Sequence, residues 1–236
     1  MSLIKPKTAL ISLSNKSNLE ILVKFLVDKE IKILSTGGTY KAIKEITSEV
    51  VEVSEFTGFE EMMDGRVKTL HPKIHAGILA RRDTDMKALE ERGYEPIDMV
   101  IVNLYPFKET IKNDCSFEEA IEKIDIGGPT MIRAAAKNFN DVTVIVDPND
   151  YQQIIDEWNA NDGITYESRK KLSQKVFAIM ADYNRSISMY FNQEEPNSIH
   201  DYEFKKSTAL RYGENPHQNA SLYTFKGLNK KNIANA

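Results

Sequence analysis

The chain has 236 residues, 41% of them hydrophobic, which is enough for one large domain or for one domain and a fragment of another. Its 31 basic and 35 acidic residues give a net charge of −4, which disfavours nucleic-acid binding but allows a local basic pocket for a small anion. Cys115 is the only cysteine, so no internal disulfide can form, which fits a reducing compartment. Met1 to Pro6 lack the apolar core of a signal peptide, and no apolar run is long enough to span a bilayer. We therefore expect a cytoplasmic protein that does not contact membranes.

Short apolar runs alternate with amphipathic segments along the first part of the chain. The predicted strands are Thr8–Leu13, Lys32–Leu34 and Val50–Val53, and the predicted helices are Leu19–Asp28 and Tyr40–Ile46. This alternation is typical of a parallel sheet with crossover helices. The first domain is therefore predicted to be an α/β domain with helices on both faces of a parallel sheet.

The middle of the chain is less regular. We expect a loop and a short helix over Thr57–Met63, an irregular segment over Gly65–Gly77, where Pro72 interrupts any helix, and a short strand over Ile78–Ala80. Further along, the apolar pattern predicts helix Asp85–Arg92, strand Asp98–Leu104, helix Phe117–Ile124, strand Val142–Val146, a helix ending near Trp158, and a long amphipathic helix over Ser168–Phe191.

A domain boundary is predicted near residue 196. Gln193–Ile199 is polar and contains Pro196, which favours a linker. Residues 1–195 form the predicted α/β domain. Residues 196–236 are interpreted as a linker and the truncated start of a second domain, because Asp201–Ala236 is too short to fold alone.

Three strand-to-helix turns carry small or hydroxyl-bearing residues, namely Ser12–Lys16, Ser35–Thr39 and the turn that follows Asp125. In an open parallel sheet such turns lie at the carboxyl ends of the strands, where ligands bind. Ser35–Thr39 offers hydroxyl and backbone N–H groups to a phosphate, although it matches neither a Walker A loop nor a GxGxxG motif. One such turn alone is more often structural, but three in one sheet favour an anion site.

The stretch that begins at Asp125 combines an acid, a Gly-Gly turn, a proline and a helix with an alanine face. Gly127 and Gly128 allow a ligand to approach closely, and Pro129 suits the first helical position, where free N–H groups favour an anion. About nine helical residues, roughly 13 Å, separate Asp125 from Lys137. Both therefore meet one ligand only if the Asp125 loop folds back or the ligand is long. A capped structural helix explains this stretch equally well.

Arg66, Lys68 and Tyr105 are further candidates for the site. Arg66 and Lys68 alternate along an irregular segment with apolar anchors, so both can point toward one site; the alternative is a solvated charged loop. Tyr105 follows a buried strand, so its hydroxyl faces either the ligand crevice or a packed interior.

Neither a metal site nor a cysteine nucleophile is expected. Pro72 lies between His71 and His75 and spoils their helical spacing, and no cysteine or carboxylate cluster completes a ligand set. Cys115 lies in a polar segment without a nearby histidine.

Several motifs, in this order along the chain, resemble those of one family: Gly65–Pro72 (GRVKTLHP), Asn103–Phe107 (NLYPF), Ile124–Gly128 (IDIGG) and Arg133–Asn138 (RAAAKN). They are similar to the N-terminal domain of the bifunctional purine-biosynthesis enzyme phosphoribosylaminoimidazolecarboxamide formyltransferase / IMP cyclohydrolase. The resemblance extends from about Thr8 to Tyr223. It implies a methylglyoxal-synthase-like fold and closure of the purine ring of 5-formamidoimidazole-4-carboxamide ribotide to IMP, with loss of water.

The resemblance also implies roles for individual residues. The chemistry would be served by Lys68, Tyr105, Asp125 and Lys137. The nucleotide would be bound by Ser14, Lys16, Thr36, Gly37, Gly38, Thr39, Arg66, Val67, Thr69, Asn103, Leu104, Ile126 and Gly127. The ring closure requires no metal and no organic cofactor. The expected partner is a small-molecule nucleotide, bound by a homodimer.

Arg211–Gln218 (RYGENPHQ) resembles the opening of the formyltransferase domain, where Arg211 and Tyr212 would help to bind aminoimidazolecarboxamide ribotide. The full-length family uses 10-formyltetrahydrofolate as the co-substrate of that reaction. This chain stops at Ala236, so we expect no formyl transfer by this chain alone.

Two alternatives stay open. Methylglyoxal synthase, on a related scaffold, would need a carboxylate base beside the phosphate turn, and Ser35–Thr39 has no adjacent acid. A regulatory nucleotide-binding domain of the same fold would leave Lys68, Tyr105, Asp125 and Lys137 without a purpose.

Overall fold

The computed structural model of the chain describes residues 3–105, 107–112, 115–192, 204–213, 215 and 217–225. The chain folds into two compact units, Met1–Ile187 and Ser188–Ala236. The linker predicted over Gln193–Ile199 lies outside the described residues, so the boundary at residue 196 stays a prediction.

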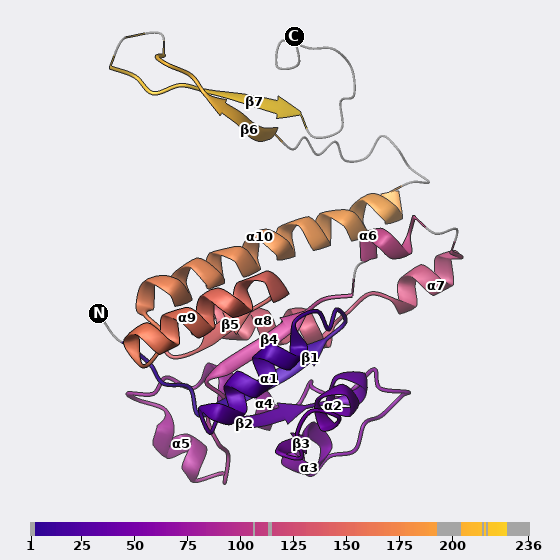
Figure 1. Ribbon diagram of the computed structural model, residues 1–236. Helices are drawn as coiled ribbons and strands as arrows, with labels where there is room; N and C mark the ends of the chain where they lie inside the picture. The colour runs from indigo at the N-terminus through magenta and orange to yellow at the C-terminus, as the bar shows by residue number, and fades with distance from the viewer. Residues whose placement is uncertain are drawn as a thin grey trace. The chain divides into compact units, whose positions relative to one another are not determined.

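The first unit is built on a five-stranded sheet in which every neighbouring pair of strands is parallel (Figure 1). The order is β3-β2-β1-β4-β5, with β1 Thr8–Leu13, β2 Lys32–Ser35, β3 Val50–Glu52, β4 Met99–Asn103 and β5 Thr143–Ile145. Strand order reverses between β1 and β4, which makes their carboxyl ends the place where an open α/β sheet binds its ligand. The predicted parallel α/β sheet is confirmed.

Helices cover both faces of the sheet (Figure 1). Their bounds are α1 Leu19–Asp28, α2 Gly37–Lys44, α3 Val53–Thr57, α4 Pro72–Leu79, α5 Met86–Glu90, α6 Phe107–Thr110, α7 Phe117–Glu122, α8 Gly127–Lys137, α9 Tyr151–Asn161 and α10 Tyr166–Phe191. α1 packs against α9, where the Phe25 and Trp158 rings meet edge to face at 5.7 Å. α8 packs on β4 and β5 and also against α4.

The core lies along the two central strands. Leu10 and Ile11 of β1 and Val100 and Ile101 of β4 are all 0% exposed. Strands that are covered on both faces need near-continuous apolar runs, and these strands have them. The central strands are therefore fixed in place, and the turns at their carboxyl ends start from a rigid base.

The region around Pro72 differs from the prediction. It was expected to be irregular and to lead into a strand over Ile78–Ala80, but Pro72 begins helix α4, which runs to Leu79. Proline is tolerated at the first helical position because that residue needs no N–H donor. The His71 side chain caps the helix by accepting a hydrogen bond from the Lys73 backbone N–H at 3.1 Å. The expectation of a strand at this point was wrong.

Other element bounds also differ. A helix, α3, follows β3 directly at Val53, where a strand residue was predicted, and Thr57 ends it, where a loop was predicted to begin. Helices α2 and α8 begin at Gly37 and Gly127, before the predicted starts at Tyr40 and Pro129. Glycine costs little in a first turn, whose N–H groups have no partner within the helix.

The second unit contains an antiparallel pair, β6 Phe204–Ala209 and β7 Ser221–Phe225, with an irregularity in register between Lys206 and Thr208. Arg211 and Tyr212 lie in the segment that joins these strands, and both are exposed. Among the described residues, no helix is long and apolar enough to cross a membrane.

Candidate active site

The candidate site is formed by the turns that follow β1, β2 and β4. Because these strands are parallel neighbours, their carboxyl ends meet at one edge of the sheet. The three turns carry Ser14–Lys16, Thr36–Thr39 and Leu104–Tyr105. Most of the residues predicted for the nucleotide site start from this edge.

The turn after β2 is arranged to bind an anion. Helix α2 begins at Gly37, which has a φ of +56°, and the first N–H groups of a helix have no acceptor within it. A Cβ placed on Gly37 would lie 3.3 Å from the Lys68 ammonium nitrogen, and one placed on Gly38 would lie 4.0 Å from that of Lys16. Two ammonium groups therefore flank the positive end of a helix dipole.

The two threonines of this turn differ in what their hydroxyl groups do. The Thr39 hydroxyl accepts from the Leu13 backbone N–H at 2.8 Å and donates to the Leu13 carbonyl oxygen at 3.1 Å. That hydroxyl ties the turn to β1, so Thr39 can offer a ligand only its backbone N–H. The Thr36 hydroxyl oxygen is buried and has no hydrogen-bond partner within the described residues. A buried hydroxyl of this kind normally has a partner, which makes Thr36 a candidate ligand.

Ser14 and Asn103 hold the β1 and β4 turns together. The Asn103 side-chain oxygen accepts from the backbone N–H groups of Ser14 at 2.8 Å and Asn15 at 2.9 Å. The Ser14 hydroxyl lies 2.8 Å from both the Asn103 side-chain oxygen and the Leu104 carbonyl oxygen. These polar groups hold the edge in shape.

Asp125 lies just before α8 and folds back over its first turn. Its carboxylate accepts a hydrogen bond from the Gly128 N–H at 2.9 Å, and its own N–H donates to the Tyr183 hydroxyl at 2.8 Å. A Cβ on Gly128 would lie 2.4 Å from the carboxylate and 2.8 Å from the Leu104 side chain, so only glycine fits there. Burial raises the pKa of the Asp125 carboxyl above its ordinary value, against the opposing effect of the Gly128 hydrogen bond.

Lys68 and Thr69 connect the two helix ends. The Lys68 ammonium lies by Gly37 at the start of α2, while the Thr69 hydroxyl would lie 2.7 Å from a Cβ on Gly127 at the start of α8. The segment Lys68–Thr69 thus connects the turn at Gly37, which can bind an anion, with the turn at Gly127 that follows Asp125. A ligand with a phosphate at one end and a reacting group at the other fits such a layout.

The remaining residues predicted for the site are exposed or only partly covered. Arg66 pairs with Glu122 of α7 at 3.2 Å, and both side chains are well exposed. Tyr105 is 54% exposed, with the Lys123 ammonium nitrogen 5.9 Å from its ring centre. Ile126 is also exposed, and Val67 is partly covered.

Comparison with known proteins identifies the family. An MGS-like domain model matches residues 18–130, and an AICARFT/IMPCHase bienzyme model matches residues 135–236. Proteins named "Bifunctional purine biosynthesis protein PurH" are similar over nearly the whole chain: 53% identity over 92% of it in Clostridium botulinum strain Langeland, and 52% over 97% of it in Fusobacterium nucleatum. The chain belongs to the PurH family.

The chain spans about half the length of these PurH relatives, 44% of the Clostridium botulinum protein and 48% of the Fusobacterium nucleatum protein. A solved structure, the crystal structure of ForH, is 32% identical to this chain with a TM-score of 0.69. The match covers 79% of this chain and all of that one. The chain has a methylglyoxal-synthase-like fold.

Lys137 stands apart from the other residues that the PurH resemblance assigns to chemistry. Lys137 is the last residue of helix α8, which is eleven residues long. The Lys137 side chain is exposed. Because α8 connects β4 to the parallel strand β5, it runs from the carboxyl edge toward the opposite edge. The helix therefore places the Lys137 backbone about 15 Å from its own start beside Asp125. Within one chain the structure does not bring Lys137 to Asp125.

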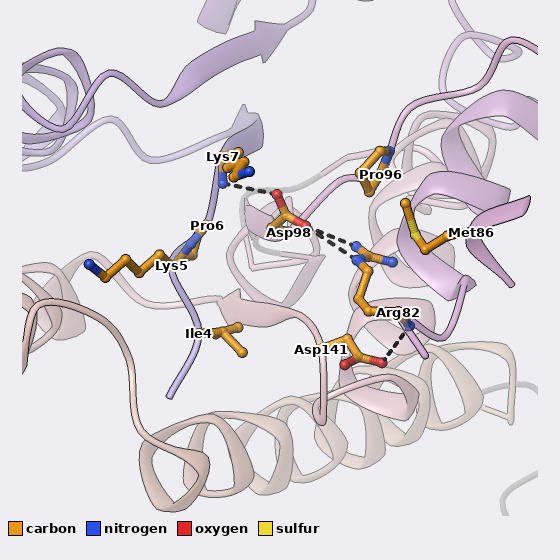
Figure 2. Close-up of a pocket in the computed structure, with 9 residues that line it drawn as sticks. All are labelled: Ile4, Lys5, Pro6, Lys7, Arg82, Met86, Pro96, Asp98 and Asp141. Carbon is orange, nitrogen blue, oxygen red and sulfur yellow. Dashed lines mark hydrogen bonds and ion pairs between the residues drawn. The ribbon is translucent and has the colours of Figure 1, made fainter. Parts of the chain in front are cut away.

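A surface pocket of about 390 Å³ lies at the opposite edge of the sheet and is a poor candidate for the PurH site (Figure 2). The Asp98 carboxylate accepts from the Lys7 and Thr8 backbone N–H groups at 2.9 and 3.2 Å and from Arg82 at 3.1 Å. The Arg82 guanidinium also donates to backbone carbonyls, among them that of Ile97 at 3.0 Å. These groups are occupied in holding the strand starts together.

The sequence did not reveal several residues that touch the site. The predicted long helix contains Tyr183, but no motif indicated that the Tyr183 hydroxyl accepts a hydrogen bond from the Asp125 N–H. Glu61 forms an ion pair with Lys68, which no motif indicated.

His75 is partly buried, and its ring Nε2 has no hydrogen-bond partner within the described residues. Burial lowers the pKa of the His75 imidazole. In the part of the chain that the structure describes, no group of three or more His, Cys, Asp or Glu residues is placed to hold a metal ion.

Proposed function

We propose that residues 1–195 are an IMP cyclohydrolase, which closes the ring of 5-formamidoimidazole-4-carboxamide ribotide to IMP with loss of water, the last step of de novo IMP synthesis. One observation carries this proposal in a chain of the PurH family. The ammonium groups of Lys16 and Lys68 at the start of α2 and the half-buried Asp125 carboxylate lie at the same edge of the sheet. The segment Lys68–Thr69 connects these two places. The reaction requires no metal and no organic cofactor.

The proposed binding mode follows the two helix ends. The ribotide phosphate lies at the start of α2, between the ammonium groups of Lys16 and Lys68 and beside the Thr36 hydroxyl. The imidazole and its two substituents extend along Thr69 toward Gly127 and Asp125. Ser14 and Asn103 bond to each other and hold the turns after β1 and β4 together, so only part of their polar groups can bind the ligand.

The chemistry is an intramolecular attack of the carboxamide nitrogen on the neighbouring formyl carbon. Holding the formamide in the closing rotamer supplies much of the acceleration. Attack leaves a negative oxygen, and we assign its stabilisation to the Tyr105 hydroxyl. Lys68, which the resemblance assigns to the chemistry, lies instead beside Gly37, where the phosphate is proposed to bind. Asp125 moves a proton from nitrogen toward the oxygen that departs as water. The raised pKa of its buried carboxyl brings it nearer to neutral pH, where proton transfer is most effective.

The proposal is tested by following ring closure of the formamido ribotide by ultraviolet absorbance with the purified chain. We expect turnover of this ribotide and none of dihydroxyacetone phosphate. Turnover of dihydroxyacetone phosphate would instead support a methylglyoxal synthase, and binding of IMP without ring closure would support a regulatory nucleotide-binding domain.

Substitutions at the phosphate turn are expected to act on binding. Thr36→Val removes the unpartnered hydroxyl of the residue before α2, and Lys16→Met removes the ammonium beside Gly38. Because the phosphate does not react, its binding energy is shared by ground state and transition state. We expect KM to rise about tenfold or more while kcat changes little, measured by steady-state kinetics. A loss confined to kcat would contradict this assignment.

Lys137 can serve this chemistry only from a second subunit. The described chain places Lys137 at the far end of α8 from Asp125, so we propose a homodimer in which each subunit supplies Lys137 to its partner's site. Cyclic dimers are the commonest assemblies of identical chains, and they exchange such residues reciprocally.

This arrangement predicts complementation between two inactive variants, Asp125→Asn and Lys137→Ala. Random pairing makes about half of the dimers mixed, and each mixed dimer keeps one intact site of two, so about a quarter of wild-type turnover should return. The variants are co-expressed or refolded together and assayed by absorbance. If Lys137 acts within its own chain, or not at all, mixing restores nothing beyond the sum of the separate variants.

The second unit is proposed to be the start of a formyltransferase domain. In the whole protein that domain would transfer a formyl group from 10-formyltetrahydrofolate to aminoimidazolecarboxamide ribotide, with Arg211 and Tyr212 among the binding residues. Both side chains are exposed on the segment between β6 and β7. We expect no formyl transfer from residues 1–236 alone.

A further inference from the structure

Lys68 is carried by a tight hairpin over residues 61–68. Met62 and Val67 face each other as an antiparallel pair, with backbone N–H to carbonyl distances of 3.0 and 3.2 Å. The hairpin is closed by Met63, Asp64 and Gly65, all with left-handed φ values of 55°, 54° and 86°. Two consecutive non-glycine residues in this conformation cost free energy, so the surrounding structure holds the hairpin in one shape.

The hairpin places Glu61 directly opposite Lys68. The two residues flank the Met62–Val67 pair, so their side chains emerge side by side from the same face. Their charged ends form an ion pair, in which the Lys68 side chain is 26% exposed and the Glu61 side chain 51%. The register of the hairpin, rather than a chance meeting of surface charges, sets this pair.

The Lys68 ammonium also reaches the anion-binding turn. It lies beside Gly37 at the start of α2, and the Lys16 ammonium lies beside Gly38. Two like charges and the positive end of a helix dipole repel one another. Glu61 is the carboxylate that offsets this repulsion at Lys68 in the structure.

We propose that Glu61 is a positioning residue that competes with the substrate phosphate for the Lys68 ammonium and thereby weakens nucleotide binding. This inference rests on the proposed function only in that the α2 turn receives the phosphate. An arriving phosphate must take Lys68 from Glu61 or share it, so part of the attraction between phosphate and lysine is offset. Glu61 thus limits how tightly the site retains both the substrate and the product IMP.

The expected effect of Glu61→Gln is tighter binding. Removing an exposed ion-pair partner of this kind changes an equilibrium by about two- to fivefold. We expect the Kd for IMP, measured by calorimetry, and the KM for the formamido ribotide each to fall about two- to fivefold, with kcat changed less than about twofold. Inorganic phosphate, as a simple probe, should raise the melting temperature of Glu61→Gln more than that of the wild type.

Glu60→Gln is the matched control. Glu60 is the neighbouring exposed carboxylate, one residue along, so the same unit of charge is removed without touching the Lys68 pair. We expect its Kd and KM to equal the wild-type values. Glu61→Asp keeps the charge, so it should leave both values closer to wild type than Glu61→Gln does.

The outcomes separate this inference from the proposed function. A higher Kd or KM in Glu61→Gln would overturn it, because Glu61 would then be holding Lys68 in place for the ligand rather than competing with it. Equal changes in Glu60→Gln and Glu61→Gln would overturn it as well, since general charge would explain both. If the wild type binds IMP and phosphate but closes no ring, the cyclohydrolase proposal fails while the binding measurements still decide the role of Glu61.

Discussion

Asp125→Asn is expected to lower kcat for ring closure by about 10²- to 10⁴-fold, because a carboxamide cannot exchange the proton that the reaction has to move. The substitution is nearly isosteric, and the amide oxygen can still accept the hydrogen bond from the Gly128 N–H, 2.9 Å from the carboxylate in the structure. We therefore expect KM and the Kd for IMP to stay within about threefold of wild type. Loss of nucleotide binding in parallel with kcat would contradict a chemical role for Asp125.

The same variant makes a prediction about stability and pH. Burial raises the pKa of the Asp125 carboxyl in the folded protein above its ordinary value of 3.8, so the folded state binds this proton more tightly than the unfolded state does. The free energy of unfolding of the wild type therefore falls as pH rises through the interval between these two pKa values. Asparagine does not ionise, so Asp125→Asn should be the more stable protein at pH 8, with the difference shrinking as pH approaches 4. If the difference in free energy of unfolding between the two proteins stays the same from pH 4 to pH 8, burial does not raise the pKa of the Asp125 carboxyl.

Arg169→Met is expected to lower the free energy of unfolding by about 3 kcal/mol and the melting temperature by roughly 10 °C. Arg169 of α10 is 0% exposed, and its guanidinium donates to the carbonyl oxygens of Phe139 and Asn140, each at 2.9 Å, and to that of Ile164 at 2.5 Å. Methionine fills a similar volume but removes the guanidinium donor from these carbonyl oxygens, while the Ile164 oxygen still accepts from the Ile4 backbone N–H. Thermal unfolding followed by circular dichroism measures the loss.

Lys170→Met is the control for this effect. Lys170 is the next residue of α10 and is exposed, so its substitution removes the same charge without uncovering a buried carbonyl group. Its melting temperature should stay within about 2 °C of wild type. Equal losses in the two variants would show that charge, and not the buried hydrogen bonds, accounts for the result.

Hydrophobic pattern was sufficient to predict the parallel sheet. The strands around Leu10 and Val100 are continuous apolar runs, and such runs bury on both faces whatever their neighbours are. The wrong secondary-structure prediction arose at a residue type that can either end or begin a helix. Proline breaks a helix in its interior but is tolerated at the first helical position. At Pro72 the helix starts, and the His71 side chain caps it.

The site was predicted in part for similar reasons. Turns at the carboxyl ends of parallel strands must share an edge, so the approach of Lys16 to the α2 turn follows from topology. Lys68 reaches the same turn from the hairpin over residues 61–68. Glu61 and Tyr183 were missed because their contacts depend on hairpin register and on the direction of a long helix, neither of which a local motif encodes. The separation of Lys137 from Asp125 followed from helix length, but no rule of sequence says whether a second chain closes that gap.

The most direct test of the account is a crystal structure of the protein with IMP bound. We expect the phosphate at the N-terminus of α2, within hydrogen-bond distance of the Lys16 and Lys68 ammonium groups and the Thr36 hydroxyl, and the purine ring beside Asp125 at the start of α8. A nucleotide bound at the opposite edge of the sheet, by Arg82 and Asp98, or with its phosphate away from α2, would contradict it.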